Sequence, residues 1–541
     1  ESYALCQSDS PLLILSVRWS KLHPCPQFNT VAMKIKSVTL HRFRHYSNPI
    51  TVEMDNLLVL VGKNDIGKSS ILEALDIFFN DGKGCVKLDK DDINKQSLAN
   101  GNDCIEIAVE FTDLPESIII DTAHQTNLAV EYLLTPDGTL KIVKKYKSAG
   151  KERVYICARH PVNPECKDLL QKKQSELRDI LRNAELECTD RSKNAVMRST
   201  IWSGQDNLNL DDNYEIEVAK EDAKNIWEQL KTYMPLYTLF QSDRKNSDSD
   251  SEVQDPMRIA VREILGDPEI KDSLETVAKV VKERLDDVAE KTLAKLQEMN
   301  PAIASSLDPQ LPEPESLKWI DVFKSVSISG DNDIPINKRG SGVKRLVLIS
   351  FFRAESERRL MEAKLPNVVY AIEEPETSQH PEHQRALLDA LIALSETNNT
   401  QVLLTSHSPE VVKKLKFDNL ILVTDGTNDG VQRIRERDLP YPSLNEVNFA
   451  AFSEATFEYH NELYGYLEAE GQLPAFRQGQ RLVSYIKQFR NGSTRQEQVV
   501  MTEYIRHQIH HPENTLNQLF SMQDLEASIS IMRTFISNGF S

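Results

Sequence analysis

The stretch LLVLVGKNDIGKSSILEAL, residues 57–75, decides the fold. Its first five residues, Leu57–Val61, are apolar and have the length of a buried strand, whereas the residues from Ser69 onward place apolar side chains at helical spacing. The loop between these segments satisfies the pattern GxxxxGK[ST] in full. A strand, this loop and a helix in this order predict a P-loop, whose backbone N–H groups and helix N-terminus wrap phosphate groups.

The P-loop supplies a set of candidate nucleotide-binding residues. We expect Lys68 to bring a positive charge to the β- and γ-phosphates and the Ser69 hydroxyl to ligate Mg²⁺. ATP and Mg²⁺ are therefore the predicted cofactors. The predicted binding residues of the loop are Gly62, Lys63, Asn64, Asp65, Ile66, Gly67, Lys68, Ser69 and Ser70.

A pair of carboxylates ends a second apolar run, in VVYAIEEPE, residues 368–376. Because successive side chains of a strand point to opposite faces, Glu373 and Glu374 are expected to serve different roles. We expect Glu373 to reach the Mg²⁺ shell and Glu374 to face the γ-phosphate, where it orients or deprotonates the attacking water. The competing interpretation is an exposed acidic strand end, which the upstream P-loop disfavours.

Two further segments carry residues that suit a bound phosphate. QVLLTSHSPE, residues 401–410, is an apolar run that ends near His407, and a neutral imidazole there is expected to hydrogen-bond the γ-phosphate. In RGSGVKR, residues 339–345, Ser341 and Gly342 precede an apolar segment and are expected to present N–H donors.

Composition excludes several classes of protein. The chain has 541 residues, and 64 Lys plus Arg against 82 Asp plus Glu give a formal net charge of −18. Hydrophobic residues at 40% and charged residues at 27% are typical of a globular protein and exclude wholesale disorder. No apolar run reaches the length of about 18 residues that a membrane span needs, and the start lacks a secretory signal, so we expect a cytoplasmic protein. Seven Cys without a CxxC pair favour reduced thiols.

The pattern of apolar and charged residues changes several times along the chain. Strand-like segments begin at Met33, so the residues before it are expected to be an extension upstream of the natural start. Charged helices separate two α/β halves, and one long helix is predicted over residues 271–299. The predicted units are an extension at 1–32, an N-terminal lobe with the P-loop at 33–160, a helical insertion at 161–317, a C-terminal lobe at 318–440 and a helical partner-docking region at 441–541.

The ordered set GKNDIGKSS, RGSGVKR, AIEEPETSQHPE and TSHSP resembles the SMC/ABC-type ATPases of the RecF and OLD (overcoming lysogenization defect) group. The resemblance covers both lobes, about residues 33–160 and 318–435. It implies an α/β fold, an ABC/SMC-type P-loop ATPase head with a helical insertion and an all-α C-terminal region. It also implies a head-to-tail dimer, or a higher oligomer, that sandwiches two ATP molecules.

The resemblance assigns a role to each matching residue. Glu374 matches the catalytic glutamate and His407 the switch histidine, whereas Ser341 and Gly342 match the signature loop that contacts the ATP of the partner subunit. Asp92, in KLDKDDIN, lies where the Q-loop metal contact is expected. The chain departs from the pattern at Glu373, where Asp is commoner, and in a signature that lacks the leucine-led form. Slow or regulated hydrolysis is compatible with both departures.

This sequence matches the arms and nuclease sites known from related proteins only weakly. One helix of about four heptads is too short for SMC arms, and Asp425 and Asp429 lie in a turn that we expect to join a hairpin rather than to form a Toprim metal site. Arg506 and His511 fit the loose pattern of HEPN ribonucleases. A helix that stops before Pro512 explains the same residues structurally.

An ATPase of this organisation without a nuclease domain resembles the ATPase subunit of Septu anti-phage systems, PtuA, including the retron-associated versions. That resemblance implies a separate HNH nuclease, PtuB, as partner, and a nucleic acid, DNA or RNA and in some systems retron-derived DNA, as a further partner. The competing classes are a RecF-like DNA repair ATPase and a stand-alone HEPN ribonuclease.

One segment is expected to contact that nucleic acid. The segment from Leu140 to His160 interleaves basic residues with Tyr146 and Tyr155, a pattern typical of nucleic-acid patches. A solvated hairpin face explains it equally well. The candidate contacts are Lys144, Lys145, Lys147, Lys151 and Arg153.

Overall fold

The fold is that of a computed structural model. It describes residues 33–82, 84–121, 124–241, 256–267, 269–283, 350, 352, 354, 367–377, 381–424, 430–435, 440–489 and 491–540.

The P-loop strand lies inside a six-stranded sheet of order β10-β11-β12-β3-β13-β14. Neighbouring strands are parallel except for β13 and β14, whose antiparallel pairing confirms the hairpin predicted after residue 424. The strands are β3 (Leu57–Val61), β10 (Leu236–Phe240), β11 (Val368–Glu373), β12 (Thr400–Ser406), β13 (Leu420–Val423) and β14 (Val431–Arg433). Segments from both predicted lobes therefore share one sheet.

Helices cover both faces of this parallel sheet, which explains the uninterrupted apolar runs of its strands. In β3, Leu58 and Leu60 belong to the core that includes α1 (Lys68–Asn80), and Val59 and Val61 belong to the core that includes α11 (Pro381–Ser395). Full burial of all five residues fixes the strand, and with it the position at which the P-loop begins.

A second six-stranded sheet is antiparallel and has the order β2-β1-β4-β7-β8-β9. Its inward side chains, such as Val38 and Ile107, join α1 in the largest hydrophobic core. The strands are β1 (Lys34–His41), β2 (Ile50–Glu53), β4 (Cys104–Thr112), β7 (Leu140–Lys147), β8 (Glu152–Pro161) and β9 (Leu210–Glu217). Smaller elements beside it are α2 (Lys95–Ala99), β5 (Ile118–Asp121), β6 (His124–Thr126) and the 3-10 turns Lys90–Asp92 and Leu169–Gln171.

The described part of the predicted helical insertion contains the strands β9 and β10 as well as helices. Within residues 161–317, β9 extends the antiparallel sheet and β10 forms an edge of the parallel one, so this range completes both sheets. The strand β9 escaped prediction because most of its residues are exposed and polar. The helices are α3 (Gln174–Asn183), α4 (Asn194–Ser203), α5 (Glu221–Tyr233) and α6 (Pro256–Gly266). Residues 269–283 are also helical, and the rest of the predicted helix 271–299 lies outside the described residues.

A buried ion network joins α4 and α5 to the ATPase lobe. The Arg198 side chain is 0% exposed, and its Nε and Nη2 donate to the two carboxylate oxygens of Glu131, both at 2.8 Å. A third bond from Arg198 reaches Asp222 at the start of α5. A guanidinium that is fully paired inside the protein links three segments that are distant in sequence.

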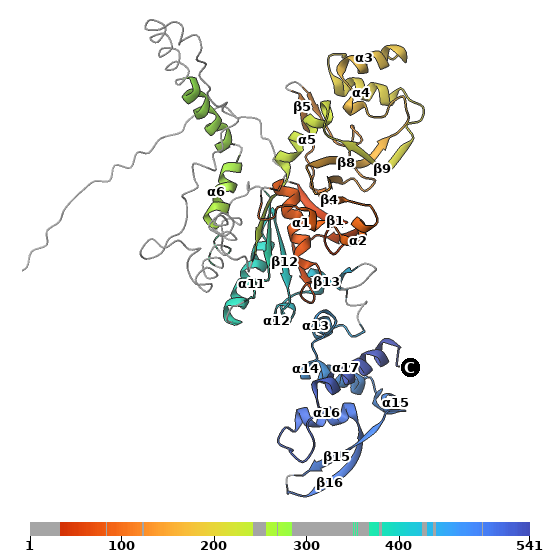
Figure 1. The fold of residues 1–541 in the computed structure, drawn as a ribbon, viewed down its shortest axis with the longest axis vertical. Coiled ribbons are helices and arrows are strands. Elements are labelled where there is room, and N and C mark those ends of the chain that lie inside the picture. Colours follow the sequence, from red (N-terminus) through yellow and green to blue (C-terminus); the bar gives the residue numbers. More distant parts are fainter. Residues whose placement is uncertain are drawn as a thin grey trace, which may run out of the picture.

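The C-terminal unit packs around its own apolar core and lies at the opposite end of the molecule from α3 and α4 (Figure 1). Its predicted helices are confirmed, but it also contains an antiparallel hairpin, so the region is not purely α. The elements are α13 (Leu444–Phe452), α14 (Phe457–Ala469), α15 (Leu473–Arg477), β15 (Leu482–Gln488), β16 (Thr494–Val500), α16 (Met501–His510) and α17 (Met522–Ser537). Asn448 of α13 donates to the Pro409 carbonyl of α12 (Pro409–Val412), close to the 3-10 turn Phe417–Asn419.

Two expectations from composition concern the whole chain. Among the described residues, no helix is both long enough and apolar enough to cross a membrane. The cysteines in the same part of the chain are free thiols.

Candidate nucleotide-binding site

The P-loop has the backbone geometry that its glycines permit. Gly62 and Gly67 have φ angles of 155° and 102°, and α1 begins at Lys68 directly after the second glycine. A Cβ atom on Gly67 would lie 2.8 Å from the Tyr46 hydroxyl, which itself donates to the Gly67 carbonyl. A side chain at that position therefore meets both steric and conformational strain.

Lys68 points into the loop rather than into solvent. Lys68 is 4% exposed, and its Nζ donates to the carbonyl of Gly62 at 2.8 Å and to that of Lys63 at 2.6 Å. Burial lowers the pKa of Lys68, and the negative charges of Glu374 and Glu376 act against this shift. The ammonium thus lies in the field of the carboxylates that end β11.

Three strand ends bring the predicted site residues together. Glu373 pairs in register with Thr405, and Ser406 pairs with Val61, so β11, β12 and β3 end side by side next to the P-loop. The carboxyl ends of parallel strands at such an edge are the usual position of a ligand site in an α/β sheet. The P-loop thus meets the carboxylate and histidine motifs, which follow it by more than 300 residues in the sequence.

Glu374 follows the last strand residue with an unusual backbone conformation. Its φ is 43°, in the left-handed region that costs a non-glycine residue about 1–3 kcal/mol. Its backbone N–H donates to the carbonyl and to the hydroxyl of Thr405, both at 3.1 Å. These bonds hold the turn that directs the Glu374 carboxylate away from the strand, where Thr377 donates to it at 3.3 Å.

His407 lies against the carboxylates. Its Nδ1 is 3.2 Å from Oε1 of Glu374 and 3.6 Å from Oε1 of Glu376. Neither contact has the geometry of a hydrogen bond. The imidazole side chain is 38% exposed, so it remains open to a ligand at the site. The parallel pairing of β11 with β12 therefore brings the predicted histidine next to the predicted carboxylate.

The sequence reading missed Glu376. Its residue is 5% exposed, and its Oε1 accepts bonds from the Ser406 hydroxyl at 2.7 Å and the His407 N–H at 3.0 Å. Its Oε2 is buried and has no hydrogen-bond partner among the described residues. The signal was available in EEPE, residues 373–376, where the third glutamate follows the pair after a proline. A buried carboxylate with one free oxygen suits a site that receives a cation or a proton donor.

The residues predicted to hold Mg²⁺ offer oxygen donors, the type that this ion prefers. Ser69 lies in the first turn of α1, and Glu373 ends β11 at the same edge of the sheet. Within the described part of the chain, no three His, Cys, Asp or Glu side chains gather as a metal site of their own. Mg²⁺ commonly keeps several waters and takes one or two carboxylates together with substrate phosphates, so this donor set fits it.

Asp92 has a different set of partners from the one predicted. One carboxylate oxygen accepts from Arg44 Nε at 2.8 Å, and the other accepts from the Asp89 N–H at 2.9 Å in a capping box. Both oxygens thus stabilise the 3-10 turn Lys90–Asp92 and its contact with Arg44. The structure gives no support to Asp92 as a metal ligand, because these local bonds already use its carboxylate.

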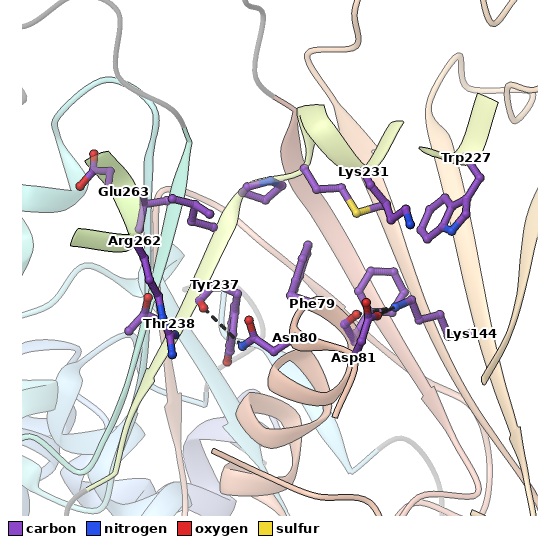
Figure 2. Close-up of a pocket in the computed structure, with 15 residues that line it drawn as sticks. Phe79, Asn80, Asp81, Lys144, Trp227, Lys231, Tyr237, Thr238, Arg262 and Glu263 are labelled. Atoms are coloured by element: carbon purple, nitrogen blue, oxygen red, sulfur yellow. Dashed lines mark hydrogen bonds and ion pairs between the residues drawn. The ribbon is translucent and has the colours of Figure 1, made fainter. Parts of the chain in front are cut away.

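Only some residues of the predicted basic patch lie on the surface. The hairpin of β7 and β8 is present, but Lys144 is 2% exposed, donates to the Phe78 carbonyl at 2.8 Å and pairs with Asp81. Figure 2 shows it beside Asp81 and Trp227, at the edge of a cavity of about 290 Å³. Lys145 pairs with Glu215 at 2.6 Å. The prediction is wrong for Lys144, because strand alternation points it inward; the exposed members are Lys147, Lys151 and Arg153.

Arg506 and His511 do not form a shared site. Arg506 lies 4.1 Å from the centre of the Tyr464 ring and pairs with Glu468 of α14, whereas His511 caps α16 and contacts Glu513. Arg506 lies within α16, whereas His511 lies just past its last residue, and the contacts of the two side chains have no residue in common. The ribonuclease interpretation is therefore unsupported, and the structural interpretation explains both residues.

Four residues discussed from the sequence lie outside the described residues. They are Ser341 and Gly342 of the predicted signature and Asp425 and Asp429 of the predicted turn.

Known proteins resemble different parts of the chain. The chain is 31% identical over 110 residues to the OLD nuclease of Thermus scotoductus, a match that spans only 20% of the chain and 20% of that relative. Two solved structures cover 74% of the chain each: an SMC head bound to the C-winged helix domain of ScpA (15% identity, TM-score 0.32, 97% of that chain) and the SMC head domain from Thermotoga maritima (13%, 0.29, 99%).

A family model gives the broadest match. It is described as AAA ATPase domain, AAA_15, and it matches residues 33–412, a range that holds the P-loop, the carboxylates of β11 and His407. That range is most of the chain. The chain therefore belongs to the AAA ATPase domain family, AAA_15, with an α/β P-loop fold and a largely helical C-terminal region.

Proposed function

We propose that this chain binds and hydrolyses ATP with Mg²⁺ and that its nucleotide state controls an associated HNH nuclease in an anti-phage defence complex. The observation that carries the ATPase part is the buried Lys68 ammonium, which lies in the P-loop and in the field of Glu374 and Glu376. The arrangement combines a phosphate cradle with carboxylates at one sheet edge.

Each residue has a role in this proposal. The P-loop amides and Lys68 bind the phosphates, Ser69 and Glu373 ligate Mg²⁺, and Glu374 orients or deprotonates the attacking water. His407, beside Glu374, hydrogen-bonds the γ-phosphate. Glu376 holds His407 and Ser406 in place through its Oε1. When bound, Mg²⁺ neutralises charge on the phosphates.

Glu376→Ala is expected to lower kcat by about 10–100-fold, a typical effect of removing an outer partner of a catalytic group. The alanine removes the acceptor of the Ser406 and His407 bonds, so the histidine loses its orientation. Glu376→Gln is expected to recover most of the rate, since an amide oxygen accepts the same two bonds. Steady-state phosphate release measures both variants. A glutamine variant as slow as the alanine variant would show that the charge matters, not the positioning.

The proposed assembly is a dimer, or a higher oligomer, of ATPase heads. Ser341 and Gly342 of one subunit are proposed to contact the ATP held by the P-loop of the partner subunit. Sedimentation of Glu374→Gln with and without ATP tests this, because a variant that retains ATP is expected to accumulate as the dimer. An unchanged sedimentation coefficient would contradict the sandwich.

The nuclease partner is proposed because the described chain does not bring a nuclease site of its own together. Arg506 pairs with Glu468 and His511 with Glu513, and we propose that a separate HNH subunit, as in Septu systems, supplies cleavage. A nucleic acid is the proposed signal, retron-derived DNA being one form. The C-terminal unit and the insertion are proposed to provide the docking contacts.

Cleavage assays test the control of a nuclease directly. The HNH protein encoded next to this chain is expected to cut DNA in a manner that changes at least tenfold with ATP in the presence of the wild-type chain. With Lys68→Ala the cleavage is expected to be independent of ATP. A neighbouring gene without an HNH protein, or cleavage that ignores both ATP and Lys68, would contradict this part of the proposal and leave the ATPase part standing.

A further inference from the structure

The hairpin of β15 and β16 in the C-terminal unit is largely exposed. Tyr485 is buried against α16, with ring centroids 5.7 Å from Tyr504 and 4.9 Å from His507, and Val499 and Val500 are buried near the hairpin's base. The described residues from 487 to 496 are all exposed. The hairpin therefore projects from the far end of the molecule, beyond α16 (Figure 1).

The segment that contains β15 and the turn of the hairpin, residues 471–496, is positively charged, whereas the whole protein is negatively charged. Residues 471–496 contain no Asp or Glu and five basic residues, in a chain whose formal net charge is −18. The basic residues are Arg477, Arg481, Lys487, Arg490 and Arg495. Of these, Arg477 is already paired with Glu503. A local basic segment on an acidic protein is the pattern that recognises a polyanion.

Strand register gathers the charges on one face. Lys487 lies directly opposite Arg495 in the antiparallel pair, and strand alternation puts both on the same face as Phe489. Like charges directly opposite one another destabilise a strand pair. Among the described residues Lys487 forms no ion pair, and Arg495 has one partner, Glu497, at 3.6 Å. Two facing cations of this kind are stabilised by an anion that bridges them.

An aromatic ring lies beside these cations. Phe489 is 41% exposed, and Lys487 Nζ lies 5.8 Å from the centre of its ring. Phe489 directly follows β15, and its N–H donates to the Ser493 carbonyl at 2.9 Å, which closes the turn of the hairpin. An exposed ring next to cations is the arrangement on which single-stranded nucleic acids stack a base while phosphates meet the charges.

We propose that the β15–β16 hairpin binds single-stranded nucleic acid, with backbone phosphates at Lys487 and Arg495 and a base stacked on Phe489. The hairpin of β7 and β8 is the weaker candidate, because Lys144 and Lys145 are paired with acids and Glu152 lies between Lys151 and Arg153. The proposal rests on the proposed function only in that it gives the nucleic-acid signal a location.

Fluorescence anisotropy with labelled 20-residue oligonucleotides tests the proposal on the full chain. The wild type is expected to bind mixed-sequence single-stranded DNA or RNA at least tenfold more tightly than the same sequence as a duplex. The double variant Lys487→Glu with Arg495→Glu is expected to lose at least tenfold in affinity. Because two phosphate contacts disappear, the slope of log K against log salt is expected to fall by about 1.4. Phe489→Ala is expected to lose about fivefold or more, as for a stacked base.

A matched control separates this surface from general charge. Lys147→Glu with Arg153→Glu makes the same charge change on the β7–β8 hairpin and is expected to leave the affinity within about threefold. ATP hydrolysis without nucleic acid is expected to be unchanged in all hairpin variants, which shows that they fold and keeps this test separate from that of the ATPase. No binding by the wild type, equal loss in the control, or full binding by the Lys487 and Arg495 variant would overturn the proposal. Duplex bound as tightly as single strands would also overturn it.

Discussion

Glu374→Gln is expected to lose ATP turnover by about 10²–10⁴-fold, the usual contribution of a general base, and to keep its affinity for ATP. Two hydrogen bonds from the Glu374 N–H to Thr405 hold the turn from which the carboxylate extends. Its Oε1 lies 3.2 Å from Nδ1 of His407. Glutamine has the same shape but cannot take a proton from water. Binding is expected to persist because the P-loop, with Lys68, supplies the phosphate contacts.

A matched control for this variant is Glu382→Gln. Glu382 lies in the first turn of α11 and is exposed, so its loss removes one carboxylate without touching the sheet edge. Its turnover is expected to stay within about twofold of the wild type. Equal turnover in Glu374→Gln and the wild type would remove Glu374 from the mechanism and point to another group.

Arg198→Ala is expected to destabilise the protein by about 3–5 kcal/mol, the cost of removing one partner from a buried ion pair. The substitution leaves the carboxylates of Glu131 and Asp222 without their cation, and Glu131 is 1% exposed. Because these acids belong to different segments, the contacts of α4 with Glu131 and with α5 are expected to weaken together.

Urea unfolding followed by far-UV circular dichroism measures this effect. Arg182→Ala is the matched control, since Arg182 pairs with Asp179 on the exposed surface of α3, where an ion pair contributes about 0–1 kcal/mol. The unfolding midpoint is expected to fall clearly for Arg198→Ala and hardly at all for Arg182→Ala. Similar midpoints for the two variants would mean that the buried network contributes little.

The nucleotide site was predictable because its chemistry lies in short consecutive motifs. GKNDIGKSS and the carboxylate pair are each contiguous, and the apolar runs before them specify buried parallel strands that end at one edge. The convergence of Glu374 with His407 follows from the register of β11 and β12, which two fully buried strands fix. Local pattern thus determined the position of most of the site.

Other features depend on contacts with segments that are distant in the sequence. Lys144 looked like a surface charge, yet strand alternation turns it toward Asp81 and the end of α1. The strand β9 is mostly exposed and polar, so only its pairing with β8 makes it a strand. Glu376 was missed because its role depends on Ser406 and His407, which lie thirty residues away in sequence. Pairing partners, not composition, decide these positions.

The central claim is that the P-loop and the carboxylates of β11 form one ATPase site. The most direct measurement determines bound ATP and released phosphate in the same sample, for the wild type and for Glu374→Gln, with Mg²⁺ and limiting ATP. The account predicts that the wild type converts its bound ATP to ADP and phosphate, whereas Glu374→Gln retains ATP intact. Phosphate release at the same rate from both proteins, or no ATP bound by either, would contradict it.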